Sequence, residues 1–265
     1  PWLETADYPL SPFAEQAQQH TRQWLKNVGL EDTPYTAQRL DAYVPGLYAA
    51  YMWSDAPLEI LLILSDLVGW FSCQDNLADE DCNDPDALER LIRGVHSRAF
   101  SGNSMNREPL GYALADIIQR ASRLMPPLWK QRVGEQYSTY LAPCATALMH
   151  RINHTQPGVE GYDSLWRNAG GFQVCLEFIY LVHNIQLSSA LYYSQPWQEL
   201  RNLALNLFKA VNDLLSFPIM ESPDEDIYNL LTHLRHTQGY TAEQAAIDVS
   251  QRIERWARQF VDATS

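Results

Sequence analysis

The sequence predicts an all-α protein, and three observations support this fold class. Apolar residues recur at helical spacing through almost the whole chain. No segment alternates between apolar and polar residues over any length, as a half-buried strand would. Breaks between the helical patterns fall at glycine and proline residues, which end helices. We therefore expect one helical domain over residues 1–265, without repeats or linkers.

The expected helices follow one another along the chain. The first covers residues 12–28, with Ser11 as its N-cap and Gly29 near its end. The remaining helices are expected at residues 57–73, 85–99, 109–123, 127–150, 161–192, 197–220, 226–236 and 241–262. The apolar segment 174–192 should lie centrally, whereas 12–28 and 241–262 are amphipathic and should lie outside.

Composition limits the function. The chain has 265 residues, of which 46% are hydrophobic, so it can bury a sizeable core. Its net charge of −13 argues against nucleic acid, whose phosphates need lysine and arginine contacts. A polyanionic substrate fits this charge only if cations mediate the contact. We expect a monomer or a homodimer.

The cysteines and the apolar segments indicate a cytoplasmic protein. The four cysteines form no CxxC pair and have no histidine at zinc-site spacing, so we expect free thiols in a reducing compartment. Residues 58–71 are the longest apolar stretch, but Glu59, Ser65 and Asp66 interrupt it, and it is too short to span a bilayer. We see no secretory signal.

The segment VNDLLSFPIMES carries the most informative pattern. Asn212 and Ser216 stand four residues apart within an apolar segment, and Glu221 follows. Residues at i and i+4 lie on one face of a helix. Oxygen ligands stacked in this way suit a hard divalent cation such as Mg²⁺.

A second segment joins an apolar helix to a carboxylate cluster. Asp75 and Asp79 are four residues apart, so their charges repel on one helix face, and a bound cation would relieve that repulsion. The alternative is a solvated acidic helix end, which the pattern alone leaves equally open.

A third segment contains two adjacent glycines, Gly170 and Gly171, inside an apolar helical stretch. A double glycine indicates a break, a kink or a close backbone approach. A broken helix leaves carbonyl dipoles that can stabilise a carbocation, and Arg167 one turn earlier can hold a diphosphate oxygen. The plainer alternative is a packing glycine pair beside a surface arginine.

Taken in order, these three segments resemble the bacterial-type class I terpene synthases, also called terpene cyclases. That family carries an acidic motif, then a diphosphate-sensing arginine, and about 45 residues later an Asn-Asp-xx-Ser-xxx-Glu motif. Arg167 precedes Asn212 by 45 residues, and the run from Ser11 to Trp24 resembles the family's opening helix. The resemblance covers roughly residues 8–262.

The resemblance implies a helical bundle around a deep apolar cavity. Three Mg²⁺ ions would bind the diphosphate of a linear isoprenyl substrate, with Mn²⁺ as an alternative metal. Asp75, with Asp79 nearby, matches the acidic motif, and Asn212, Ser216 and Glu221 match the chelating triad. Arg167 matches the diphosphate sensor, and Gly170 matches the linker position. Gly171 matches the effector, at which the backbone carbonyl is the functional group. Aromatic rings near the motifs are candidates for substrate contact, each against the alternative of core packing: Trp53, Phe71, Phe172, Phe178 and Phe208.

The chain departs from the family pattern at three places. Position 76 is Asn where the family often has a second Asp. Glu221 stands one residue later than the family's Glu, and Pro218 lies before it, so we expect a one-residue π-bulge that returns Glu221 to the metal face. The family continues to a C-terminal Arg-Tyr pair that this sequence lacks, and we expect a missing tail.

The predicted function is ionisation and cyclisation of farnesyl diphosphate to a sesquiterpene hydrocarbon or alcohol, with release of diphosphate. Geranyl and geranylgeranyl diphosphate are alternative substrates. A chain-elongating prenyltransferase is disfavoured because the second motif is not rich in Asp. Asn76 and Met220 support a further alternative, a non-catalytic helical protein that binds isoprenoids.

Overall fold

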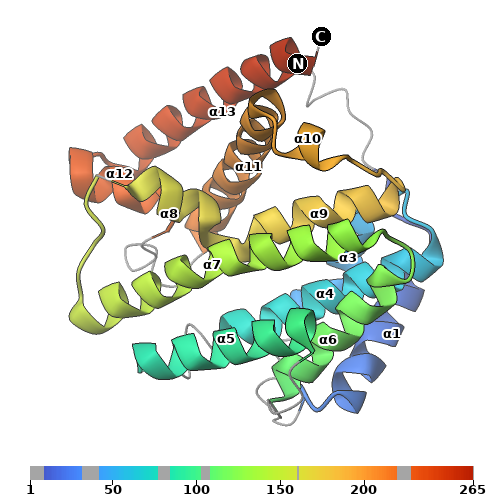
Figure 1. Ribbon diagram of the computed structural model, residues 1–265. Coiled ribbons are helices and arrows are strands. Elements are labelled where there is room, and N and C mark those ends of the chain that lie inside the picture. Colours follow the sequence, from blue (N-terminus) through green and yellow to red (C-terminus); the bar gives the residue numbers. More distant parts are fainter. Residues whose placement is uncertain are drawn as a thin grey trace. The chain divides into compact units, whose positions relative to one another are not determined.

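Helix is the only regular secondary structure in the part of the chain that the computed structural model describes, which confirms the all-α class (Figure 1). The described residues are 9–31, 42–76, 84–102, 108–159, 161–219 and 228–264. They form two compact units, the first from 1–138 with 174–186 and the second from 139–173 with 187–265. The single domain expected over 1–265 stays a prediction.

The first unit holds the N-terminal helices. Its elements are α1 (Ala14–Asn27), α3 (Pro45–Met52), α4 (Leu58–Asn76), α5 (Pro85–Ser101), α6 (Pro109–Ser122), the first part of α7 (Pro127–Asn153) and most of α9 (Phe172–Val182). The helix α4 is central among them, because it packs against α1, α3 and α6.

Local sequence signals explain several helix ends. The Asp84 carboxylate accepts hydrogen bonds from the backbone N–H groups of Asp86 and Ala87 at the start of α5. Gly102 ends that helix with φ +70°. The expected N-cap role of Ser11 is wrong. Phe13 is the N-cap of α1, and Ser11 lies two residues before it, where its hydroxyl accepts a hydrogen bond from the Phe13 N–H at 3.4 Å.

Large aromatic side chains fill the core of the first unit and satisfy their polar atoms there. Trp70 on α4 is fully buried and donates its indole N–H to the Leu110 carbonyl at 2.9 Å. The Tyr137 hydroxyl donates to the Gln74 side chain at 2.7 Å. Each such bond avoids the cost of about 1–3 kcal/mol for an unpaired buried polar group.

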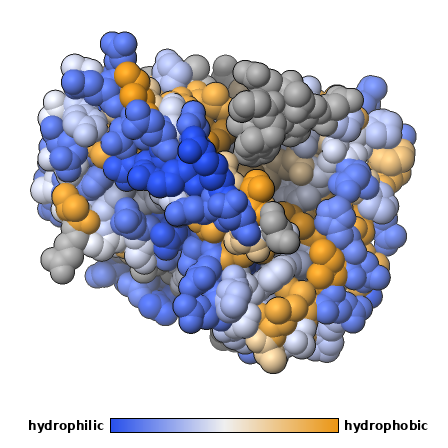
Figure 2. Space-filling view, turned by 90° about the horizontal axis from the view of Figure 1, so that it is seen from above, coloured by the Kyte–Doolittle hydropathy of each residue, from blue (hydrophilic) through white to orange (hydrophobic). Residues whose placement is uncertain are grey.

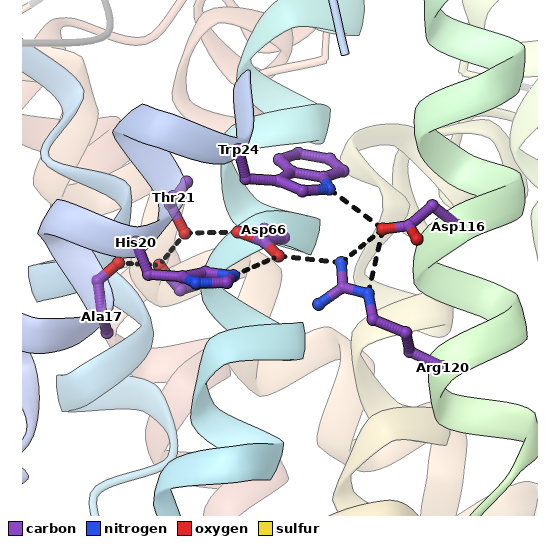
Figure 3. Close-up of polar contacts among 8 residues, drawn as sticks. Ala17, His20, Thr21, Trp24, Asp66, Asp116 and Arg120 are labelled. Atoms are coloured by element: carbon purple, nitrogen blue, oxygen red, sulfur yellow. Dashed lines mark hydrogen bonds and ion pairs between the residues drawn. The ribbon is translucent and has the colours of Figure 1, made fainter. Parts of the chain in front are cut away.

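A buried carboxylate on α4 joins three helices of the first unit (Figure 3). Asp66 is inaccessible to solvent, and it accepts hydrogen bonds from Thr21 of α1 at 2.6 Å and from Arg120 of α6 at 2.8 Å. Arg120 also pairs with Asp116, which accepts from the Trp24 indole at 2.9 Å. These contacts link α4 to α1 and α6 within the first unit.

The helix α3 was not predicted. Its sequence, PGLYAAYM, is short and apolar, so it shows no amphipathic period. It forms because Gly46 allows α1 and α3 to approach closely: the Gly46 N–H donates to the Gln18 side chain at 2.7 Å.

The second unit is built around α11. Its elements are the last part of α7, α8 (Tyr162–Asn168), the 3₁₀ turn η2 (Ala169–Gly171), α10 (Ser189–Tyr192), α11 (Gln195–Ser216), the 3₁₀ turn η3 (Phe217–Ile219), α12 (Leu230–Gln238) and α13 (Ala242–Thr264). The helix α11 packs against α8, α12 and α13. The core here includes Tyr162, Trp166, Ala210, Leu231 and Val249.

The continuous helix expected over 161–192 is wrong. The structure breaks it at residues 169–171, ends α9 at Val182, and resumes only with the four-residue α10. Residues 183–186 are exposed, so the central position expected for 174–192 holds only for the α9 part.

One buried histidine gives the second unit a predicted pH dependence. His233 on α12 stacks on Tyr162 with ring centroids 3.4 Å apart, and burial lowers its pKa below the usual value. Asp163 opposes that shift, whereas Arg252 and His236 add to it. Because the unfolded chain binds this proton more tightly, the free energy of unfolding should fall as the pH drops below about 6.5.

The variant His233→Phe keeps an aromatic ring at this position without a titratable group. We expect urea unfolding at pH 7 and pH 5.5 to show a smaller loss of stability in this variant than in the wild type. An equal loss in both proteins would contradict the assignment to His233.

Hydrophilic residues cover much of the face shown in Figure 2, and hydrophobic residues form several separate groups among them. Among the described residues, no helix combines the length and the apolar character needed to cross a membrane.

Candidate metal and diphosphate site

The helix α11 carries the second motif on an exposed face. Asn212 is exposed, and Ser216 one turn later is half-buried, with its hydroxyl 3.4 Å from the Asp213 carbonyl. The structure thus brings these two predicted ligands together on one helix. Three of their apolar neighbours are exposed rather than buried: Phe208 and Val211 are each 38% exposed, and Leu215 is 67% exposed.

The end of α11 differs from the expected π-bulge. Residues 217–219 wind into a 3₁₀ turn, which is tighter than an α-helix, whereas a π-bulge is wider. Pro218 lacks the N–H that would continue the α-helical ladder, which explains a change of winding at this point. Glu221 lies outside the described residues.

Beside the exposed Asn212, Asp213 is almost completely buried, with 1% of its surface accessible. Its carboxylate accepts hydrogen bonds from the Lys209 ammonium at 2.5 Å, the Trp166 indole at 2.7 Å and the Leu230 backbone N–H at 2.9 Å. Burial raises the pKa of this carboxyl group, and these three donors act in the opposite direction. The sequence offered one signal for this pair, a Lys and an Asp four residues apart in an apolar helix.

Asp75 lies near the end of α4 in the first unit and is half-buried. Its charge acts on two thiols: burial, and then Asp75, raise the pKa of Cys73 and of Cys175 to about 12. Both thiols are therefore protonated at neutral pH. None of Cys73, Cys144 and Cys175 is in a disulfide bond, as expected for those three. Asp79 and Cys82 lie outside the described residues.

The double glycine lies where the helix is interrupted in the second unit. Gly170 and Gly171 have φ of +80° and +69°, in the left-handed region that favours glycine. This break separates α8 from α9 and leaves Arg167 in the last turn of α8. The Arg167 Nε donates to the Asn206 side chain of α11 at 2.8 Å, and its carbonyl accepts from Gln173 at 2.8 Å.

We predict that Gly170→Ala lowers both the stability and the turnover of the protein. A Cβ there would lie 3.0 Å from the Phe172 ring, and the positive φ adds about 1–2 kcal/mol of strain. Gly161→Ala is the matched control, since Gly161 has φ +76° and open space around it. We expect both variants to lose about 1–2 kcal/mol in urea unfolding, and turnover to fall only in Gly170→Ala. Equal turnover in the two variants would contradict a role for the break.

The five candidate aromatic residues fall into two groups. Trp53 and Phe178 are buried in the first unit, where the Phe178 ring packs edge-on against Trp129 at 5.2 Å, as core residues do. Phe71 is half-buried on α4. In the second unit, Phe172 and Phe208 pack edge-on at 4.6 Å, and Phe208 is partly exposed beside Asn212.

The described part of the chain shows two further negative findings. It contains no group of three or more His, Cys, Asp or Glu residues able to hold a metal ion. A groove of about 410 Å³ in the first unit, lined by residues of α5 and α7 such as His96 and Phe100, contains none of the predicted site residues.

Comparison with known proteins identifies the family. Residues 66–259 match the family described as terpene synthase family 2, C-terminal metal binding. The chain belongs to this terpene synthase family. It is therefore a class I terpene synthase, as the three motifs indicated.

Individual terpene synthases agree with this assignment. The chain is 29% identical to (−)-delta-cadinene synthase of Streptomyces clavuligerus over 96% of this chain and 78% of that protein. It is 28% identical to a (+)-T-muurolol synthase of Roseiflexus castenholzii, named as (2E,6E)-farnesyl diphosphate cyclizing, over 84% of this chain and 68% of that protein. The crystal structure of an α-eudesmol synthase superposes with a TM-score of 0.86 at 16% identity, covering 98% of this chain and 84% of that one, which supports the shared fold.

Proposed function

We propose that this terpene synthase cyclises farnesyl diphosphate in a Mg²⁺-dependent reaction, giving a sesquiterpene hydrocarbon or alcohol and diphosphate. One observation carries the proposal. The exposed face of α11 presents oxygen ligands, Asn212 and Ser216, beside exposed apolar side chains, Phe208, Val211 and Leu215. Such a face suits a substrate with a charged diphosphate head and a hydrocarbon tail.

The donor atoms fit a hard divalent cation. Asn212 supplies an amide oxygen, Ser216 a hydroxyl and Asp75 a carboxylate, the ligand types that Mg²⁺ takes. Asp79 and Glu221 complete the proposed ligand set, and three ions are expected with substrate bound. When bound, these cations would neutralise the charge that develops on the departing diphosphate.

Arg167 and the glycine break would serve the ionisation step. The guanidinium of Arg167 is held at Nε by Asn206, and its planar fork suits a diphosphate oxygen. In that step the carbon–oxygen bond of the substrate breaks, and its electron pair leaves with diphosphate, which gives an allyl cation. The backbone carbonyl of Gly171, with Gly170 as linker, would stabilise that cation through its dipole.

Aromatic rings would contact the hydrocarbon chain and the cation. Phe172 and Phe208 form an edge-on pair in the second unit, and Phe71 is half-buried in the first. The face of an aromatic ring attracts a cation by about 0.5–2 kcal/mol. We place substrate contact at these three rings rather than at Trp53 and Phe178, which are buried in the core.

The (+)-T-muurolol synthase supports farnesyl diphosphate as the substrate, because its name states that it cyclises this compound. The test is incubation of the protein with geranyl, farnesyl and geranylgeranyl diphosphate and Mg²⁺ under a solvent overlay. We expect cyclic C15 products and diphosphate release with farnesyl diphosphate. Turnover confined to another chain length would contradict the substrate, and no turnover with any of the three would favour a non-catalytic isoprenoid-binding protein.

A further inference from the structure

A buried ion pair on α11 lies directly beside the proposed metal ligands. Asp213 follows Asn212 directly and lies three residues before Ser216. Its carboxylate accepts hydrogen bonds from Lys209 on its own helix, from Trp166 on α8 and from the first N–H of α12. Lys209 in turn donates to the Tyr228 carbonyl at 2.7 Å. The pair therefore ties α11 to two other segments of the second unit.

Stability does not explain this arrangement well. Transfer of two charges into the interior costs several kcal/mol per ion, and well-packed apolar residues often give equal or greater stability. The pair instead fixes the orientation of α11. The Asp213 carboxylate accepts hydrogen bonds from two other helices, α8 and α12, so α11 cannot rotate about its axis without breaking at least one of these bonds.

Rotation matters because the ligands are on the helix surface. Side-chain atoms lie about 5–6 Å from a helix axis, so a rotation of about 20° moves them by about 2 Å. That displacement equals a whole Mg–O distance of about 2.0–2.1 Å, and Mg²⁺ tolerates little departure from octahedral geometry.

We propose that Asp213, with Lys209, is a positioning residue that fixes the rotation of α11 and so holds Asn212 and Ser216 in the orientation that binds metal. The proposal rests on the proposed function, since it needs these two residues to be ligands. Asp213 itself has no place in the metal's coordination, because its carboxylate is buried and already bonded to three donors.

The first unit offers a matched control in Asp66 (Figure 3). Its carboxylate is also fully buried, pairs with a cation (Arg120) and accepts from a hydroxyl (Thr21). It lies nine residues before Asp75, a rise of about 13.5 Å along α4. Replacement of either aspartate should destabilise the protein, but only Asp213 lies next to the ligands it would position.

The experiment measures Mg²⁺ affinity by calorimetry with inorganic pyrophosphate present, at a temperature where circular dichroism shows each protein folded. We expect Asp213→Asn to raise the Kd for Mg²⁺ about tenfold, in line with the effect of residues that orient metal ligands. Asp66→Asn should lower Tm comparably and leave Kd within about twofold. Equal weakening in both variants, or no change in Asp213→Asn, would overturn the positioning role.

Lys209→Gln separates positioning from charge. Loss of a positive charge near the site would by itself tighten Mg²⁺ binding, whereas a disturbed helix orientation would weaken it. We expect a higher Kd, and a lower one would overturn the proposal even if Asp213→Asn fails to fold. A wild type that binds no Mg²⁺ with pyrophosphate would instead contradict the proposed function, and the positioning role with it.

Discussion

Asn212→Ala and Asp75→Ala should each lower turnover of farnesyl diphosphate by about 100-fold or more. Residues that only orient metal ligands cost about 10–100-fold when replaced, so a ligand itself should cost at least the upper part of that range. Asn212 is exposed on α11 and Asp75 is half-buried near the end of α4, so neither truncation opens a cavity in a core. Far-ultraviolet circular dichroism should therefore show unchanged helicity.

Diphosphate release at limiting Mg²⁺ measures this effect most sensitively. The control is Asn202→Ala, because Asn202 is also an exposed asparagine of α11 but lies ten residues before Asn212. It should leave turnover unchanged. Near-normal turnover of Asn212→Ala or Asp75→Ala at limiting Mg²⁺ would remove that residue from the proposed ligand set.

Gly46→Ala should cause a large loss of stability. An added Cβ would lie 2.2 Å from the Gln18 backbone nitrogen and 2.3 Å from its Cα, and backbone atoms of a packed helix cannot yield locally. Alanine favours a helix over glycine by about 1 kcal/mol, so the clash must exceed that gain. We expect a net loss of about 3 kcal/mol or more, at the upper end for overpacked sites.

Gly69→Ala is the control for this substitution. Its Cβ would also meet α1, but only side-chain methyl groups, at 3.0 Å from Thr21 and 3.3 Å from Leu25. These atoms can shift, so urea unfolding should show a loss of about 1 kcal/mol or less, below the range typical of rigid overpacked sites. A Gly46→Ala protein as stable as Gly69→Ala would show that α1 and α3 can separate without cost.

The fold class and most helix positions were predictable, because apolar period and capping residues are local signals. The 109–123 and 241–262 patterns, for example, correspond to α6 at Pro109–Ser122 and α13 at Ala242–Thr264. The predictions failed where contacts between residues far apart in the sequence determine the local structure. Gly46 packs against Gln18, 28 residues away, and no period in PGLYAAYM reveals that helix.

The same distinction between local and distant contacts applies to the candidate site. Asn212, Ser216 and the glycine break at Gly170 could be found from spacing, because their geometry is set within one helix or one turn. The burial of Asp213 could not, since its partners Trp166 and Leu230 are 47 and 17 residues away. The tight turn at 217–219 was also missed, because a proline shows where the helix must change but not whether it winds tighter or wider.

The most direct test of the central claim is a crystal structure of the protein with Mn²⁺ and inorganic pyrophosphate, recorded with anomalous scattering. The account predicts Mn²⁺ peaks within ligand distance of Asn212 and Ser216 on α11 and of Asp75 on α4, with pyrophosphate bound to the metal and to Arg167. Pyrophosphate bound away from Arg167, or Mn²⁺ at neither motif, would contradict it.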